Sequence, residues 1–262
     1  MNNSNNKKNM NLTIVKNKNN NRKNNNNKKN NNNSRMTNEE LFKYINEHAN
    51  EVGIENVEGK FLNPLSGKNE YSNVYKEEAK KWSSWATYKE RNKVYDALKK
   101  NQVILLTAAT GAGKSVLVPK LVLHYLKYQK RVIMTLPKKK PVDLGVNYAS
   151  KTLNEPVGKG VGYQYRGSTY KTDKTKLIYT TSGTLGAIIN SDPSLSEYGA
   201  VVIDEAHERD ISIDFLLAKL KESLKLNPEL KLIIMSATVN AKIFEDYFNK
   251  DFKYEYIQIG TE

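Results

Sequence analysis

Residues 103–115 decide the fold, because they read V-I-L-L-T-A-A-T-G-A-G-K-S and an apolar segment of helical length follows them. An apolar run, a glycine-containing turn, a Lys-Ser pair and a helix form the arrangement of a phosphate-binding loop. The glycines let backbone N–H groups curl around phosphate oxygens, and the helix N-terminus adds a partial positive charge. The residues expected to bind phosphate are Thr110, Gly111, Ala112, Gly113, Lys114 and Ser115.

The Lys-Ser pair has the most specific chemistry in this loop. We expect Lys114 to bridge the β- and γ-phosphates of a nucleotide and the Ser115 hydroxyl to ligate Mg²⁺. The loop departs from the general motif at Ala108, where glycine is usual, and alanine is the smallest replacement. We therefore expect the loop to keep its function. The alternative, a Gly-Lys-Ser turn that arose by chance, leaves the flanking strand and helix unexplained.

A second chemical element lies at residues 201–209, which read V-V-I-D-E-A-H-E-R. The apolar strand delivers two adjacent carboxylates at its carboxyl end, where open α/β sheets bind their ligands. We expect Asp204 to hold Mg²⁺ through water, and Glu205 to orient and deprotonate an attacking water. An isolated Asp-Glu pair after a strand is more often a solvated loop. Together with the upstream phosphate-binding loop, the pair predicts a hydrolytic site.

The remaining pattern predicts an α/β fold. Short apolar runs occur at residues 103–107, 131–136, 177–180, 200–203, 231–235 and 254–259, with helix-length amphipathic segments between several of them. Continuous apolar runs suit strands that are buried on both faces, which means a mostly parallel sheet flanked by helices. The fifth run ends in Ser236-Ala237-Thr238. Alone this triplet could simply cap a helix, and its value lies in its order and spacing after the first two motifs.

These motifs together resemble the DEAH-box helicases of superfamily 2. Asp204-Glu205-Ala206-His207 is the motif that gives this family its name, and the resemblance covers about residues 90–260. Further matching segments are Asp192-Pro193, Tyr198, Glu208-Arg209, residues 232–238, residues 180–185, residues 136–140, and residues 162–164 with Arg166. The resemblance implies a RecA-like P-loop NTPase domain that binds ATP with Mg²⁺ and couples NTP hydrolysis to remodelling of RNA.

The resemblance also assigns roles to individual residues. His207 would hydrogen-bond toward Ser236 and Thr238 and so couple the nucleotide state to domain movement, rather than serve as a core histidine. The residues expected to line the path of a single RNA strand are Thr135, Lys138, Lys139, Arg166 and Thr181. Lysines stand where the family has arginines, which keeps the charge but loses the bidentate fork. Ser182 replaces the Asp of the segment usually written T-D-G.

Two features of the family remain open in this chain. Tyr148 occupies the position at which relatives stack an arginine on adenine, so it either stacks on the base or is an ordinary surface tyrosine. The segment that carries the arginine finger of a second RecA-like domain does not occur. We therefore expect weak ATP binding and slow hydrolysis alone, with a second RecA-like domain on another chain as partner. The alternatives are an inactive fragment and a nucleotide-dependent module that binds nucleic acid or protein.

Composition excludes several other classes. The 262 residues include no cysteine, which excludes a disulfide scaffold, a zinc ribbon and a thiol nucleophile. The three histidines lie too far apart in the sequence to suggest metal ligands. No apolar run reaches the roughly 18–20 residues that span a bilayer, and the basic N-terminus lacks the apolar core of a secretory signal. We therefore expect a soluble, intracellular protein with no membrane contact.

The net charge of +14 is concentrated at the N-terminus, because residues 1–38 hold nine Lys or Arg and no acid. We expect residues 1–36, which are rich in Asn and Lys, to be a disordered tail, either an arm that attracts nucleic acid or a neutral Asn expansion. Residues 37–89 would form a helical extension, and residues 90–262 the RecA-like domain. Thr37 to Glu40 fits a capping box. A second helix is expected from Lys76 to Lys100, with Trp82, Trp85 and Tyr88 docked on the core or stacked on a base.

Overall fold

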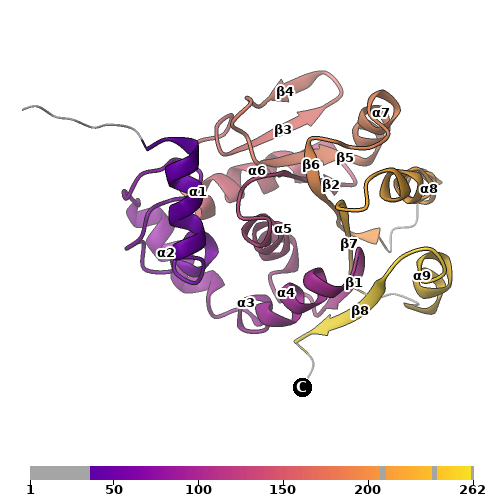
Figure 1. Ribbon diagram of the computed structural model, residues 1–262, viewed down its shortest axis with the longest axis horizontal. Coiled ribbons are helices and arrows are strands. Elements are labelled where there is room, and N and C mark those ends of the chain that lie inside the picture. Colours follow the sequence, from indigo (N-terminus) through magenta and orange to yellow (C-terminus); the bar gives the residue numbers. More distant parts are fainter. Residues whose placement is uncertain (1–35, 207–210, 238–240, 261–262) are drawn as a thin grey trace, which may run out of the picture. The chain divides into compact units, whose positions relative to one another are not determined.

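One mixed sheet organises the part of the chain that the structure, a computed structural model, describes: residues 36–206, 211–237 and 241–260. The strand order is β4-β3-β5-β2-β6-β7-β1-β8 (Figure 1). The strands are β1 (Val103–Ala108), β2 (Arg131–Leu136), β3 (Val161–Tyr165), β4 (Ser168–Tyr170), β5 (Leu177–Thr181), β6 (Tyr198–Ile203), β7 (Lys231–Ser236) and β8 (Tyr254–Ile259). Only β3 and β4 pair antiparallel among these described strands, so the mostly parallel sheet is confirmed.

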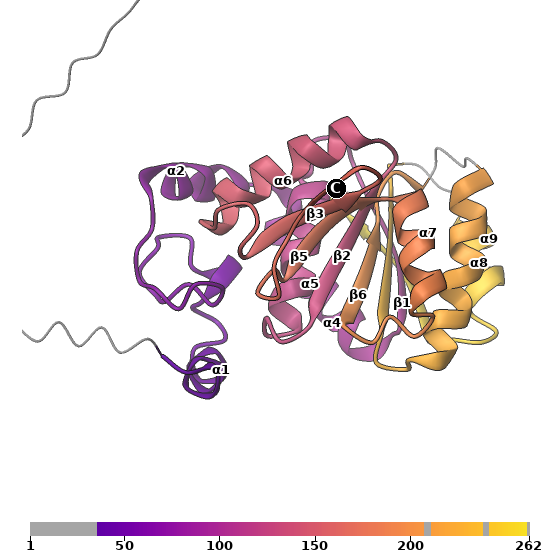
Figure 2. The same ribbon diagram turned by 90° about the horizontal axis from the view of Figure 1, so that it is seen from above.

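Helices cover both faces of the sheet (Figure 2). The described helices are α1 (Asn38–Glu47), α2 (Asn73–Trp82), α3 (Ala86–Lys89), α4 (Arg91–Lys100), α5 (Lys114–Tyr125), α6 (Lys139–Leu153), α7 (Ser182–Ser191), α8 (Ile211–Leu226) and α9 (Ala241–Phe248), with a 3₁₀ turn at Gly53–Glu55. Helices α4, α5 and α6 lie against one face, and α7, α8 and α9 against the other. Helix α2 packs on the outer side of α6.

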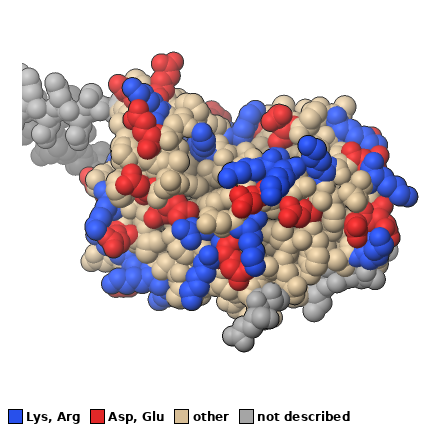
Figure 3. All heavy atoms as spheres, turned by 60° about the horizontal axis from the view of Figure 1, so that its bottom comes forward, with Lys and Arg blue, Asp and Glu red and all other residues tan. Residues whose placement is uncertain are grey.

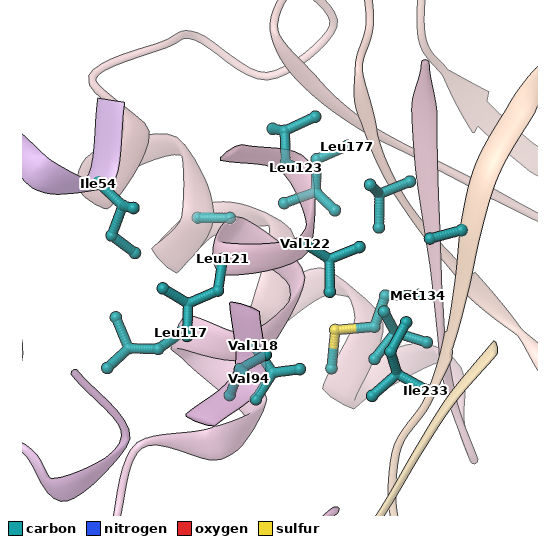
Figure 4. Close-up of a cluster of buried hydrophobic side chains, with 14 of the residues drawn as sticks. Ile54, Val94, Leu117, Val118, Leu121, Val122, Leu123, Met134, Leu177 and Ile233 are labelled. Carbon is teal, nitrogen blue, oxygen red and sulfur yellow. The ribbon is translucent and has the colours of Figure 1, made fainter. Parts of the chain in front are cut away.

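The central strands send alternate residues into two separate cores, which explains their unbroken apolar sequences. In β1, Ile104 and Leu106 belong to the core beneath α4, α5 and α6, whereas Val103 and Leu105 belong to the core beneath α7, α8 and α9. Figure 4 shows the first core, with Val118 and Val122 of α5 facing Met134 and Ile233 of the sheet, and Leu121 facing Ile54 on the other side of the helix. Both faces of the sheet therefore exclude water, and the carboxyl ends of its strands are left to carry polar chemistry.

The N-terminal part of the described chain confirms one local prediction and corrects another. The capping box is present, because the Glu40 N–H donates to Thr37 Oγ1 and the Thr37 N–H donates to a Glu40 carboxylate oxygen. The single helix predicted from Lys76 to Lys100 is wrong: it is divided into α2, α3 and α4. The hydroxyls of Ser83 and Ser84 donate to carbonyls of the last turn of α2, and extended backbone follows at residue 85.

The sequence also left β3 and β4 unpredicted as strands. Gly162 and Gln164 interrupt the apolar pattern of β3, and β4 is three residues long. Residues Arg35–Glu262 form one compact unit, and the boundary predicted at residues 89 and 90 remains a prediction. The tail predicted over residues 1–36 lies outside the described residues except for Met36.

Candidate active site

Three strand ends bring the sequence motifs together. Strands β6, β7 and β1 are neighbours in the sheet and run parallel, so their carboxyl ends lie at the same edge. The phosphate-binding loop follows β1, Asp204 follows β6, and Ser236 is the last residue of β7. Ser236 pairs with Thr107 across β7 and β1 and is fully buried. The predicted residues therefore meet at one place although 121 positions separate Ser115 from Ser236 in the sequence.

The phosphate-binding loop has the backbone that its glycines predict. Gly111 and Gly113 both have φ of +84°, a conformation that side chains rarely adopt, and Lys114 begins α5. The Ala112 N–H donates to the carbonyl of Ala109, which closes the turn. Ala108 is the last residue of β1 and is buried, so its backbone has no need of glycine. The loop thus has a conformation in which N–H groups at the start of α5 are available for phosphate oxygens.

Asp204 is held rigidly below the loop. Its side chain is 2% exposed, it accepts hydrogen bonds from the Ser115 hydroxyl and the Glu205 N–H, and its own N–H donates to the carbonyl of Thr135. Burial raises the pKa of the Asp204 carboxyl, and the Ser115 hydrogen bond opposes that rise. Two oxygen ligands, the Ser115 hydroxyl at the start of α5 and the Asp204 carboxylate at the end of β6, therefore lie on one side of the same pocket, as a site for a hard divalent cation requires.

Glu205 adopts a strained conformation next to the loop. Its φ is +55°, in the left-handed region where a non-glycine residue costs free energy. The Glu205 carboxylate is 31% exposed and lies 3.9 Å from the Lys114 ammonium, whose side chain is 10% exposed. With this backbone, the carboxylate lies on the side of Lys114. A carboxylate at this position can accept a proton from a water near the phosphates.

Thr87 and Trp85 support the loop from outside. The sequence predicted Trp85 only as a ring docked on the core or stacked on a base, and docking is confirmed, whereas Thr87 was missed. The N–H and the hydroxyl of Thr87 both donate to the Ala112 carbonyl, at 3.2 and 2.7 Å. The Trp85 ring lies so close to Gly113 that a Cβ there would approach it to 2.3 Å. No local pattern identifies these residues, because their position depends on the break between α2 and α3.

A pocket of about 410 Å³ adjoins the site between α5 and α6. Ser115, Asp204 and Glu205 line one part of it, and Lys120 and Tyr148 line another. The Tyr148 hydroxyl donates to a carboxylate oxygen of Glu78 at 2.5 Å, so α2 fixes the ring. Tyr148 is therefore part of the wall of the same pocket as Ser115, Asp204 and Glu205.

Four of the five residues predicted to contact RNA lie near one another at the carboxyl ends of β2, β3 and β5. Lys138, Lys139 and Arg166 are exposed, and the Lys139 ammonium donates to the Arg166 carbonyl at 2.7 Å. Thr181 is half-buried and lies beside Leu136 in the sheet register. The Thr135 side chain is fully buried and has no hydrogen-bond partner among the described residues, so it does not share this surface.

Two predicted residues and the tail cannot be placed. His207 and Thr238 lie outside the described residues, so the predicted coupling of His207 to Ser236 and Thr238 has no geometry here. On the face seen in Figure 3, Lys and Arg side chains are interspersed with Asp and Glu rather than gathered into one basic area. Among the described residues no helix is both long and apolar enough to cross a membrane.

Comparisons with known proteins give the same family throughout. The family described as DEAD/DEAH box helicase matches residues 88–246. A putative ATP-dependent RNA helicase of Acanthamoeba polyphaga mimivirus is 41% identical over 202 residues, which is 76% of this chain and 29% of that protein. The putative ATP-dependent RNA helicase DHX57 of Homo sapiens is 34% identical over 63% of this chain and 12% of its own length.

A solved structure extends the similarity to the fold. The DEAH/RHA helicase HrpB of Escherichia coli superposes with a TM-score of 0.63 at 30% sequence identity, over 68% of this chain and 22% of that one. This similarity confirms the RecA-like fold that was expected from the sequence. The chain thus spans less than a third of each of these three proteins.

Proposed function

Because the chain belongs to the DEAD/DEAH box helicase family, we propose that its sheet edge binds ATP with Mg²⁺, hydrolyses the nucleotide and couples hydrolysis to remodelling of RNA. The observation that carries this proposal is the meeting of two motifs. Ser115 hydrogen-bonds to Asp204, and Lys114 lies 3.9 Å from Glu205. A chance turn or a solvated loop gives no reason for these four side chains to converge.

The donor set fits Mg²⁺, which prefers oxygen ligands. Ser115 would supply its hydroxyl, and the buried Asp204 carboxylate would act directly or through water. When bound, the ion neutralises charge that develops on the phosphates. Asp204 is positioned for this by the hydrogen bond from its N–H to the Thr135 carbonyl. Thr135 thereby supports the site through its backbone, whereas its side chain lies in the core.

Glu205 is the proposed general base. A water beside the terminal phosphate would give its proton to the Glu205 carboxylate as its oxygen bonds to the γ-phosphorus. The bond from that phosphorus to the β,γ-bridging oxygen would break and ADP would leave, while Lys114 and the loop N–H groups hold the phosphate oxygens. The left-handed backbone of Glu205 and the hydrogen bond from its N–H to Asp204 fix the direction in which the Glu205 side chain leaves the backbone. His207, Ser236 and Thr238 keep the proposed role of linking this centre to domain movement.

The pocket between α5 and α6 supports a base-binding role for Tyr148. Its ring lines the same pocket as Ser115 and Asp204, and Glu78 holds its hydroxyl. We propose that the adenine lies over this ring. The phosphates in the loop and the base at Tyr148 would then occupy two ends of one pocket. Because Tyr148→Ala removes the ring and Tyr148→Phe keeps it, the alanine variant is expected to weaken ATP binding more.

The exposed cations near the ends of β2 and β3 are the proposed contacts for RNA phosphates, namely Lys138, Lys139 and Arg166, with Thr181 beside them. Relatives are far longer than this chain, and we propose that efficient turnover needs a second RecA-like domain that closes over the nucleotide. The domain described here would then hydrolyse ATP slowly when tested alone.

Substitution of the general base tests the hydrolytic proposal. Glu205→Gln removes the proton acceptor but keeps the shape of the side chain, so it should retain binding of a fluorescent ATP analogue and lose phosphate release. Glu222→Gln is the matched control, because Glu222 lies on α8 with a side chain that is 68% exposed. Equal phosphate release by wild type and Glu205→Gln would refute the assignment. Loss of nucleotide binding after Lys114→Ala should accompany loss of turnover.

A further inference from the structure

Three tyrosines, Tyr163, Tyr165 and Tyr170, form a ladder on one face of the β3–β4 hairpin. Tyr163 lies directly opposite Tyr170 in the antiparallel register, and Tyr165 is two residues further along β3, so all three side chains leave the same face. The rings of Tyr163 and Tyr165 are stacked, with centroids 5.2 Å apart and planes inclined by 18°. Tyr170 meets Tyr163 edge to face at 6.4 Å.

The tyrosine ladder is fixed at both ends. The Tyr165 hydroxyl donates to an Asp143 carboxylate oxygen of α6 at 2.8 Å. The Tyr170 ring lies against the backbone of Gly158, where a Cβ would approach the ring to 2.7 Å. Tyr170 nevertheless remains 54% exposed. A large ring is therefore held in place against glycine while much of its surface faces solvent.

Lys139 connects this ring system to the proposed phosphate contacts. The Lys139 ammonium lies 5.4 Å from the centre of the Tyr165 ring and donates to the carbonyl of Arg166, whose side chain is exposed. The exposed Lys159 follows Gly158, whereas Lys171 lies over the opposite face of the hairpin, beside Gly162. The Asp143 carboxylate is engaged by Tyr165. The Tyr165 end of the ladder thus adjoins Lys139 and Arg166.

We infer that the tyrosine ladder is a stacking platform for an unpaired base of single-stranded RNA, with Tyr170 supplying the exposed ring. Aromatic rings beside lysine and arginine bind single strands by stacking on bases while the cations contact phosphates. Lys139 links the proposed phosphate contacts to the tyrosine ladder, since its ammonium donates to the Arg166 carbonyl and lies near the Tyr165 ring. The inference rests on the proposed function, because it adds base contacts to the proposed phosphate contacts at the carboxyl ends of β2, β3 and β5.

An abasic strand separates stacking from phosphate contact. Binding of an oligouridylate and of an abasic oligonucleotide of the same length would be measured by fluorescence anisotropy, with wild type, Tyr170→Ala and Tyr170→Phe. We expect wild type to bind the oligouridylate at least about fivefold more tightly than the abasic strand, the effect of one base stack. Tyr170→Ala should lose that preference, and Tyr170→Phe should keep it.

Tyr247→Ala is the matched control. Tyr247 lies on α9, is 38% exposed, and has the Lys221 ammonium 4.5 Å from its ring centre. The Tyr247→Ala variant should bind the oligouridylate and the abasic strand with the same affinities as the wild type. A folded Tyr170→Ala variant that retains the preference, or a wild type that binds both strands equally, overturns the stacking platform but leaves phosphate binding intact. Absence of binding to either strand overturns the proposed RNA contacts and the platform with them.

Discussion

The buried Lys120 provides a quantitative test of how α5 and α6 are packed. Its side chain is 3% exposed, and its ammonium donates to the Thr152 hydroxyl. Burial lowers the pKa of Lys120 from 10.5 to about 7, and the more distant charge of Glu78 only partly opposes this effect. We predict that Lys120→Met, which keeps the length of the side chain and removes the charge, stabilises the protein at neutral pH.

The magnitude follows from the pKa. In the unfolded chain Lys120 keeps its proton up to about pH 10.5, whereas the folded protein releases it above about pH 7. The unfolded state therefore binds more protons between these values, so this group makes the wild type more stable as pH rises. At about 1.4 kcal/mol per pH unit, the burial costs roughly 5 kcal/mol at and below pH 7 and nothing above pH 10.5.

Urea unfolding followed by circular dichroism at a series of pH values measures this difference. The advantage of Lys120→Met should be largest near pH 7 and decline by up to about 1.4 kcal/mol for each unit of increasing pH. Lys99→Met is the control, because the Lys99 side chain is 66% exposed and its replacement should change stability by less than about 0.5 kcal/mol. A difference that does not vary with pH, or a Lys120→Met variant less stable than wild type at pH 7, would refute the reasoning.

Two further substitutions test the supports of the site and of the second core. Thr87→Val removes the hydroxyl that donates to the Ala112 carbonyl, which should cost about 1 kcal/mol of stability and weaken binding of a fluorescent ATP analogue; unchanged affinity would show that the loop does not depend on this contact. Phe248→Ala empties a fully buried position on α9 and should cost about 3–5 kcal/mol in urea unfolding, with nucleotide affinity of the folded protein unchanged; a loss below about 1 kcal/mol would contradict the packing described for that core.

The phosphate-binding loop and the carboxylate pair could be predicted because their chemistry is local in sequence. A strand, a loop with glycines and a helix follow one another without interruption around Lys114, and Asp204 comes directly after an unbroken apolar run. Parallel strands then bring the two segments to one edge of the sheet. Their proximity could therefore be predicted from the fold class alone, and the apolar runs predicted that fold class.

The break in the predicted helix at residues 76–100 could not be found in this way. Residues 83–85 carry no proline or glycine, and beyond the break Trp85 and Thr87 contact the phosphate-binding loop. That contact joins parts of the chain about 25 residues apart and overrides local helix propensity. Trp82 is buried and meets Tyr88 at 5.1 Å, which confirms docking on the core for that ring.

The buried Thr135 shows where resemblance and local geometry diverge. A family motif locates the residue near the nucleic acid, but alternation along β2 turns its side chain into the protein. Tyr163, Tyr165 and Tyr170 were missed for the opposite reason. Strand β3 contains glycine and glutamine, β4 is only three residues long, and the neighbourhood of the rings depends on a hairpin register that is not visible in the sequence pattern.

The two hydrogen bonds from Thr87 to the Ala112 carbonyl have a thermodynamic consequence. Order in the phosphate-binding loop and order in the segment around α3 are linked, so whatever stabilises one also stabilises the other. A nucleotide that orders the loop should slow proteolysis near residue 87, although it touches nothing there. Conversely, the segment that carries Trp85 and Thr87 restricts the phosphate-binding loop before any nucleotide binds. The loop should therefore lose less conformational entropy on nucleotide binding.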